Sequence, residues 1–148
     1  MKNRKKRVLF VCVGNACRSQ MAEAFARAYG SDVMIPASAG LAPAPHVAPD
    51  TLLAMQEKNL DLRHQFPKAI RHLRRSQFDF VVNMAGIIMP LEVEAPVRYW
   101  NVDDPVSMSY EDHCAVRDEI ERLVMQLVLE LRREPVPVEA DGQEAGSE

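Results

Sequence analysis

The sequence has few cysteines, no long apolar run and no large excess of either charge. Its three cysteines are an odd number, whereas the disulfide framework of a small secreted protein needs cysteines in pairs. We therefore expect a reducing, cytoplasmic location. No apolar run approaches the roughly 18 residues that a membrane-spanning helix needs, so we expect no membrane partner.

Other classes of protein are also disfavoured. The apolar run VLFVCV that follows the basic start MKNRKKR is too short for a signal peptide, and no small-residue cleavage pattern follows it. The net charge of −3 gives no reason to expect a nucleic acid partner. The four histidines show no metal-ligand spacing, so we predict no metal site. We expect two of them, His72 and His113, on the surfaces of helices.

The chain does contain enough apolar sequence for one folded domain. It has 148 residues, of which 47% are hydrophobic and 26% charged, as is ordinary for a globular protein. Residues 1–6 form a basic N-terminal tail. Residues 134–148 are rich in Pro, Gly and Glu, and we expect a disordered acidic tail there.

Between the tails, strand patterns alternate with helix patterns. Residues 7–12 are a short apolar run that is typical of a strand buried on both faces. Apolar residues then recur at helical spacing from Ser19, and Gly30 ends the segment. The remaining patterns predict strands over 33–40, 78–84 and 96–100, and helices over 50–60, 67–76 and 110–133. The order predicts a single α/β domain, a four-stranded parallel sheet with helices on both faces, whose sites lie at the carboxyl ends of the strands.

The stretch CVGNACRS falls at such an end, between the first strand and the first helix. A helix N-terminus and successive loop amides favour a bound anion. Gly14 lets the backbone bend or approach a ligand closely, and Arg18 supplies a planar fork that grips a tetrahedral oxyanion. The predicted oxyanion-binding residues are Val13, Gly14, Asn15, Ala16, Cys17, Arg18 and Ser19.

Cys12, at the end of the strand, is the candidate nucleophile. The positive surroundings of the loop favour a thiolate, and Ser19 can donate a hydrogen bond to it. Displacement at phosphorus also needs a proton donor for the leaving group. Asp103 and Asp104, on a loop after another predicted strand, are the candidates.

The stretch CVGNACRSQMAE resembles the active-site loop of the low-molecular-weight protein tyrosine phosphatases and of the arsenate reductases built on the same fold. The resemblance extends through SAG, LDL, VDDP and VRDEI. It implies a phosphatase-like catalytic domain over residues 7–133, with Cys12 as nucleophile, Arg18 as oxyanion clamp and Asp104 as general acid.

The resemblance also implies that Ser19 supports the thiolate, that Asn15 organises the loop and that no cofactor takes part. RSQMAE is nearer to the arsenate reductases, because the phosphatases more often have proline after the serine. The thioredoxin-linked reductases carry a pair of resolving cysteines after the third strand, where this chain reads NMAGIIMP. Ala85 stands in the first of these positions, so that internal disulfide relay is absent.

The resemblance to the phosphatases is incomplete too, since they usually place aromatic residues just after the Asp-Pro pair. Here Pro105 is followed by Val106, Ser107 and Met108. We favour a phosphatase that hydrolyses phosphotyrosine-like or small aryl phosphomonoesters through a phosphocysteine intermediate. The first alternative is an arsenate reductase that uses Cys12 with an external thiol as reductant. The second is a module that binds an oxyanion without turnover.

Cys17 and Cys114 are the other two cysteines. Cys12 and Cys17 share one tight loop, so a sulfenic acid on Cys12 can condense with Cys17 if the loop rearranges. This predicts a redox role for the pair, and the alternative is that Cys17 only packs beneath the loop. Cys114 is expected to be structural.

Lys68 carries one further prediction. In the arsenate reductases that the chain resembles, the matching position tends to be acidic and helps to hold a potassium ion beside the loop. Asn15, Glu23 and Ser38 match the other positions of that site. A lysine ammonium can take the cation's place and pair with Glu23, and the alternative is a surface lysine at a helix start.

Overall fold

A computed structural model of the chain describes residues 4–73, 77–89 and 95–133. The acidic tail expected over 134–148 lies outside the described residues. At the other end, the Arg4 guanidinium forms two hydrogen bonds of 2.6 and 2.9 Å with the Asp79 carboxylate. No helix in the described part of the chain is long and apolar enough to span a membrane.

Four parallel strands form the sheet, and their spatial order is β2-β1-β3-β4. The central strand is buried on both faces, with Val8 to Val11 all fully inaccessible to solvent. This arrangement confirms the four predicted strands and the parallel sheet. Their bounds are β1 Lys6–Cys12, β2 Met34–Gly40, β3 Phe80–Asn83 and β4 Val97–Tyr99.

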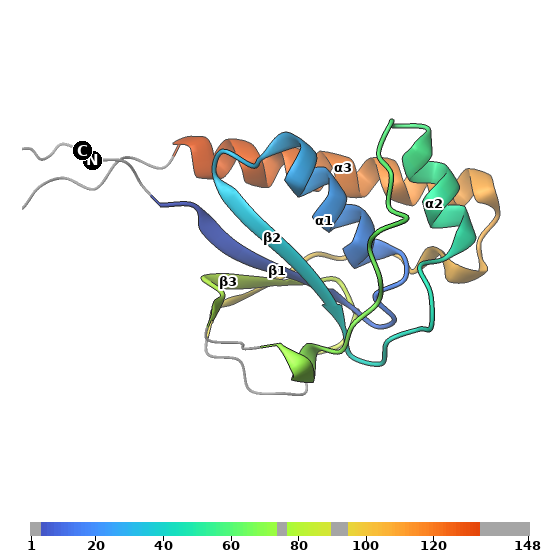
Figure 1. The fold of residues 1–148 in the computed structure, drawn as a ribbon, viewed down its shortest axis with the longest axis horizontal. Coiled ribbons are helices and arrows are strands. Elements are labelled where there is room, and N and C mark those ends of the chain that lie inside the picture. The colour runs from blue at the N-terminus through green and yellow to red at the C-terminus, as the bar shows by residue number, and fades with distance from the viewer. Residues whose placement is uncertain (1–3, 74–76, 90–94, 134–148) are drawn as a thin grey trace, which may run out of the picture.

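Three helices cover one face of this sheet (Figure 1). They are α1 Arg18–Tyr29, α2 Pro49–Gln56 and α3 Tyr110–Arg133. The inward side chains of β1 on this face, such as Phe10, pack with Phe25 of α1 and Ile120 of α3 in one core cluster. The apolar residues whose helical spacing predicted α1 and α3 therefore form the stripe of side chains that each helix buries against the sheet.

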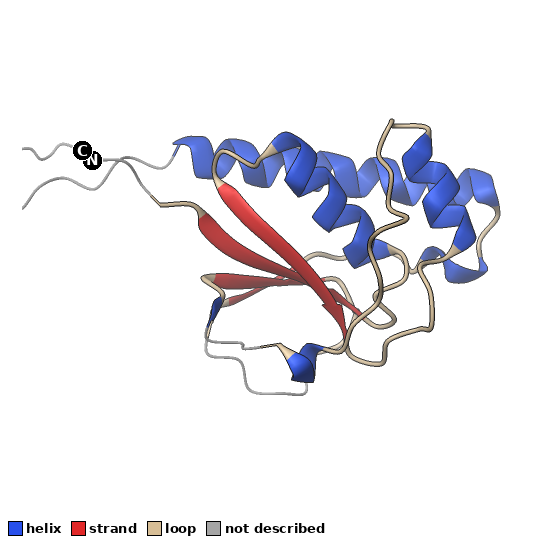
Figure 2. Cartoon of the chain, in the orientation of Figure 1, coloured by secondary structure: helices blue, strands red, loops and turns tan. Residues whose placement is uncertain are grey.

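The other face of the sheet differs from the prediction of a helix over 67–76. Within the described residues, that segment contains only a single 3-10 turn, η1 Ile70–His72, packed against this face (Figure 2). The Gly40 N–H donates to the Lys68 carbonyl at 2.8 Å, and Ala69 bridges Gly40 in a parallel sense. This extended pairing with the end of β2 replaces the first turn of the predicted helix. The fold class is confirmed as a single α/β domain with a four-stranded parallel sheet and three helices.

The helix expected over 50–60 is also shorter than predicted, since α2 ends at Gln56. Asn59 adopts a left-handed conformation with φ of 62°, and the Leu60 N–H reaches back to the Met55 carbonyl at 3.0 Å. Such a left-handed residue is a common way to end a helix.

Candidate active site

The loop that joins β1 to α1 forms a cradle of unpaired donors. The N–H groups of Gly14, Asn15, Ala16 and Cys17 donate to no backbone or side-chain group in the described part of the chain. Several carbonyls of the loop are occupied instead, because residues 41–48 run alongside it and donate to Cys12, Val13, Gly14 and Ala16 at 2.9–3.2 Å. Residues 41–48 thus hydrogen-bond to the carbonyls of the loop, and the N–H groups of the loop remain free to bind an anion.

Arg18, the first residue of α1, is held from two sides. Its side chain is almost fully buried, and Nη1 donates to the carbonyls of Met84 at 2.5 Å and Val102 at 3.1 Å. These carbonyls follow β3 and precede Asp104, so the guanidinium is fixed between two loops at the carboxyl end of the sheet. Its Nε is buried and has no hydrogen-bond partner among the described residues. An oxyanion in the cradle would satisfy this orphaned donor.

The sulfur of Cys12 accepts two hydrogen bonds. Its Sγ lies 2.9 Å from Ser19 Oγ and 3.4 Å from the Ser19 N–H. The Asn15 amide donates to the same Ser19 oxygen at 2.6 Å, which leaves the hydroxyl proton free to point at the sulfur. Both contacts hold the sulfur in place at the base of the cradle.

Asn15 adopts a left-handed conformation with φ of 51°, and three contacts hold it there. Besides its bond to Ser19, its Oδ1 accepts from the Lys68 backbone N–H at 2.9 Å. Its carbonyl accepts from the Gln20 side chain at 2.9 Å. Asn tolerates this conformation better than most residues, and the structure places Asn15 where the resemblance expects an organiser of the loop.

Gly40, the last residue of the SAG stretch and one for which the sequence predicted no role, lies directly behind the loop. A Cβ at this position would come within 2.8 Å of the Val13 carbonyl and 2.9 Å of the Asn15 Cβ. The corresponding atom at Gly14 would meet nothing closer than 3.8 Å. Protein packing around the loop therefore demands glycine at Gly40 rather than at Gly14. The glycine at the end of a strand next to the loop is the sequence signal that points to it.

Of the two candidate acids, the structure places Asp104 at the cavity over Cys12. Its Oδ2 lies 3.5 Å from Arg18 Nη2, and its Oδ1 accepts from the Val106 N–H at 3.2 Å. The second contact caps the short turn η3, Pro105–Ser107. Asp103 is exposed and does not line the cavity.

The cavity over Cys12 has a volume of about 170 Å³. Its rim includes Val13 and Val106, which are 37% and 67% exposed, and no aromatic side chain of the described residues lines it. The lining residues are Cys12, Val13, Gly14, Ala16, Cys17, Arg18, Ala44, Asp104 and Val106.

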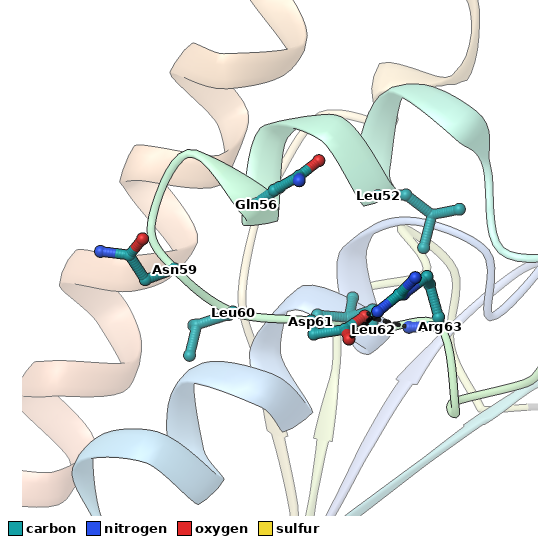
Figure 3. Close-up of a pocket in the computed structure, with 7 residues that line it drawn as sticks. All are labelled: Leu52, Gln56, Asn59, Leu60, Asp61, Leu62 and Arg63. Atoms are coloured by element: carbon teal, nitrogen blue, oxygen red, sulfur yellow. Dashed lines mark hydrogen bonds and ion pairs between the residues drawn. The ribbon is translucent and has the colours of Figure 1, made fainter.

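A larger cavity of about 400 Å³ lies at α2 and the turn that follows it (Figure 3). It shares no lining residue with the cavity over Cys12. Its two charged residues, Asp61 and Arg63, pair with each other at 2.8 Å, and this pairing lowers the pKa of Asp61 to about 2. Its charged groups therefore satisfy one another rather than face a ligand.

Cys17 lies at the start of α1 and also lines the cavity over Cys12. Burial raises the pKa of its thiol to about 11, so Cys17 is a protonated thiol at neutral pH. Cys114 is half-buried in α3 and does not line the cavity.

The prediction that His113 lies on a helix surface is wrong. Its side chain is only 1% exposed, and Nε2 lies 2.9 Å from the Thr51 hydroxyl of α2. The first turn of α3 packs against α2, which turns this position inward. His72 is exposed as expected, although it lies in η1.

Of the two alternatives for Lys68, the ion pair with Glu23 is not formed among the described residues. The Glu23 carboxylate instead accepts from Ser38 at 2.5 Å and from Arg27 at 2.9 Å, while the Lys68 ammonium donates to the Phe66 carbonyl at 3.1 Å. Arg27 is the nearer cation because it lies one turn along the same helix. Each carboxylate oxygen of Glu23 therefore accepts a hydrogen bond from a protein side chain, and no group of three or more His, Cys, Asp or Glu side chains that could hold a metal ion occurs in the described residues.

Comparison with known proteins identifies a matching family and several similar proteins. A family described as low molecular weight phosphotyrosine protein phosphatase matches residues 7–137. The "Glutaredoxin arsenate reductase" of Synechocystis sp. is 31% identical over 130 residues, which are 85% of this chain and 98% of that protein. An "Arsenate reductase" of Bacillus cereus is 37% identical over 120 residues, or 78% of this chain and 89% of that protein.

Solved structures agree in fold. An arsenate reductase described in a phosphate binding state matches with a TM-score of 0.78 and 31% identity, over 85% of this chain and 98% of that one. The YwlE arginine phosphatase from Geobacillus stearothermophilus has a TM-score of 0.75 at 24% identity, over 86% of this chain and 93% of that one. The second likeness is evidence of a shared fold alone.

Proposed function

The chain belongs to the low-molecular-weight phosphotyrosine protein phosphatase family, and from this premise we propose that it is an arsenate reductase that combines Cys12 with an external thiol. The relatives named as arsenate reductases support this alternative better than the phosphatase that the sequence favoured. The observation that carries the proposal is the small cavity over Cys12, which has an aliphatic rim. At about 170 Å³ it is below the size of about 300–1,000 Å³ that is usual for drug-sized ligands.

The cavity suits a small oxyanion for three reasons. The free loop amides and the orphaned Arg18 Nε supply donors on several sides of a tetrahedral anion. Val13 and Val106 at the rim offer no aromatic face against which a phosphotyrosine ring would stack. The carboxyl of Asp104 stands at the mouth, where an oxygen would leave.

In the first step, the Cys12 thiolate attacks arsenic. A sulfur–arsenic bond forms and one arsenate oxygen leaves as water, its last proton donated by the Asp104 carboxyl. Arsenic keeps its oxidation state of +5 in this step. Ser19 holds the sulfur in line, and Arg18 with the loop amides holds the remaining three oxygens.

The second step needs a thiol that the cradle does not supply in an activated form, because Cys17 is protonated at neutral pH. An external thiolate attacks Cys12 Sγ, and the electron pair of the sulfur–arsenic bond passes to arsenic, which leaves as arsenite. A second external thiolate then attacks the mixed disulfide and frees Cys12. The balance is arsenate plus two thiols, which give arsenite, one disulfide and water.

A phosphatase is the second candidate, and the family description favours it. The same residues would transfer phosphate to Cys12, with Asp104 protonating the leaving alcohol, and water would then hydrolyse the phosphocysteine. The third candidate is a module that binds an oxyanion without turnover. It does not explain why a carboxyl group, Asp104, lies at the mouth of the cavity.

The test is to supply the purified protein with arsenate plus glutathione and glutaredoxin, arsenate plus thioredoxin, and an aryl phosphate, in parallel. We expect arsenite to form with an external thiol system and to be absent with Cys12→Ser. The Cys12→Ser variant should still gain thermal stability from added phosphate, since the cradle is intact. Aryl phosphate hydrolysis without arsenite formation would replace the proposal by the phosphatase. Oxyanion binding without either product would replace it by the binding module.

A further inference from the structure

Gln20 is a fully buried polar residue of α1 that the steps above do not use. Its side-chain amide donates to the backbone carbonyl of Asn15 at 2.9 Å and to that of Phe66 at 3.1 Å. Its Oε1 accepts from the side-chain amide of Gln65 at 2.6 Å. Because a carbonyl only accepts hydrogen bonds, the NH₂ group must face the two carbonyls, and each of its hydrogens has a partner.

The Asn15 carbonyl belongs to the loop that joins β1 to α1, which we call the oxyanion loop. Backbone N–H groups of residues 41–48 donate to the four other carbonyls of this stretch, those of Cys12, Val13, Gly14 and Ala16. No backbone N–H of the described residues donates to the Asn15 carbonyl. The Gln20 side chain thus supplies the one outer hydrogen bond that residues 41–48 do not.

Holding these carbonyls from outside also orients the N–H groups of the loop. In a trans peptide the carbonyl and the N–H point in opposite directions, and every peptide bond of the described residues is trans. An outward carbonyl at Asn15 therefore turns the Ala16 N–H toward the cavity, which Ala16 lines. Gln20 is the side chain that holds this carbonyl.

The other contacts of Asn15 do not replace this one. Its side chain donates to Ser19 and accepts from the Lys68 backbone N–H. These bonds fix the Asn15 side chain, but they do not involve the peptide group between Asn15 and Ala16. Without Gln20, that carbonyl would lack its hydrogen bond, and nothing would oppose rotation of the peptide toward another donor.

We propose that Gln20 is a positioning residue, which orients the peptide between Asn15 and Ala16 so that the Ala16 N–H donates to the bound oxyanion. The inference rests on the oxyanion binding that the proposed function requires. It holds whichever reaction follows, because arsenate and phosphate are tetrahedral anions of the same shape.

The first test measures the affinity for inorganic phosphate by titration calorimetry. Gln20→Met keeps the length of the side chain and removes both donors. We expect it to weaken phosphate binding roughly 10–100-fold, as the loss of a hydrogen bond to a charged group does. Gln65→Met is the matched control, since it removes the partner of Gln20 Oε1 and leaves both donors in place. Water can reach the half-buried site of Gln65, so this variant should bind phosphate within about threefold of wild type.

Equal losses of phosphate affinity in Gln20→Met and Gln65→Met would overturn the inference. Such a result would show that the contact between α1 and residues 65–66 matters as a whole, and not the donor to the Asn15 carbonyl. Unchanged affinity in Gln20→Met would overturn it as well.

A second measurement follows single amide protons by NMR at saturating phosphate. An N–H that donates to an anion forms a short, strong hydrogen bond, and its proton resonance moves downfield. We expect this shift at both Gly14 and Ala16 in wild type. In Gln20→Met the shift of Ala16 should be lost, whereas that of Gly14 should remain, because the Ala42 N–H still holds the Val13 carbonyl.

Loss of the downfield shift at both Gly14 and Ala16 would show general loosening of the loop and contradict the role of Gln20. If the Ala16 proton of wild type does not move with phosphate, the inference is wrong even where Gln20→Met fails to fold. Phosphate binding without arsenite formation would overturn the proposed function alone. Arsenite formation with an unchanged Ala16 shift in Gln20→Met would overturn this inference alone.

Discussion

Asp104 and Asp103 are neighbours in sequence, yet only Asp104 lines the cavity over Cys12. If Asp104 protonates the leaving oxygen, Asp104→Asn should slow turnover by roughly 10²–10⁴-fold. Asp103→Asn is the matched control and should be close to wild type. The measurement is the single-turnover rate of arsenate consumption, so that the later thiol steps do not mask the loss. A larger loss of turnover in Asp103→Asn than in Asp104→Asn would show that Asp103, and not Asp104, is the general acid.

The second prediction at the residue scale concerns Cys17 and follows from the predicted redox role of the Cys12–Cys17 pair. After peroxide treatment, we expect wild type to recover activity with dithiothreitol and Cys17→Ser to lose it irreversibly, because only Cys17 can trap the Cys12 sulfenic acid. Since the pKa of Cys17 is raised to about 11, trapping should become faster as the pH rises toward that value. Equal recovery of the two proteins would leave Cys17 with a packing role.

The end of β2 packs directly against the oxyanion loop, so the size of the residue at Gly40 affects the conformation of the loop. Gly40→Ala would place a methyl group within 2.8 Å of the Val13 carbonyl, and backbone has little room to move there. Gly30→Ala is a matched control, since its methyl would meet Val128 at 2.6 Å at the far end of α1. We expect both variants to lose thermal stability, and only Gly40→Ala to lose the stabilisation that phosphate gives. Similar phosphate-induced shifts in melting temperature for both variants would contradict this role of Gly40.

Helix α1 and strand β2 are also joined by Glu23, whose carboxylate accepts from Ser38 of β2 and from Arg27 one turn along α1. Because the Arg27 guanidinium already lies 2.9 Å from Glu23, we expect exchange of sodium for potassium to leave the melting temperature and activity of the wild type unchanged. Arg27→Gln should lower the melting temperature, whereas Arg122→Gln on the exposed side of α3 should not. A marked potassium response of the wild type would show that a free cation is still needed beside Glu23.

For the whole molecule, the sequence predicts what is local and misses what is brought together from a distance. The strand β1, the loop and α1 follow one another along the chain, so their pattern of apolar residues, glycine and arginine was enough to locate Cys12 and Arg18. The helix expected over 67–76 had the right local pattern, but pairing with the end of β2 overrides it. Gly40 contacts the loop and His113 contacts Thr51, and these partners lie far from them along the chain. A glycine at a strand end gives a local signal for Gly40, whereas no local pattern marks the contact of His113.

Stability toward acid is a property of the whole molecule, and two sets of groups determine it over different pH ranges. Carboxylates paired across the chain, such as Asp79 with Arg4, have a lowered pKa, so their contribution is present above their ordinary pKa and is lost as the pH falls below about 4. His113 also has a lowered pKa. The unfolded chain therefore binds its proton first, and the free energy of unfolding should already fall as the pH drops below about 6.5.

Urea unfolding between pH 8 and 3 separates these two contributions. In His113→Gln the fall that begins near pH 6.5 should be smaller, while the steeper fall below about pH 4 should remain. Added salt should weaken only the second, because the carboxylate pairs are exposed to solvent and screened, whereas His113 is buried. His72→Gln is the matched control, since that ring is exposed. An unchanged profile for His113→Gln between pH 5 and 7 would show that burial of His113 does not couple folding to its protonation.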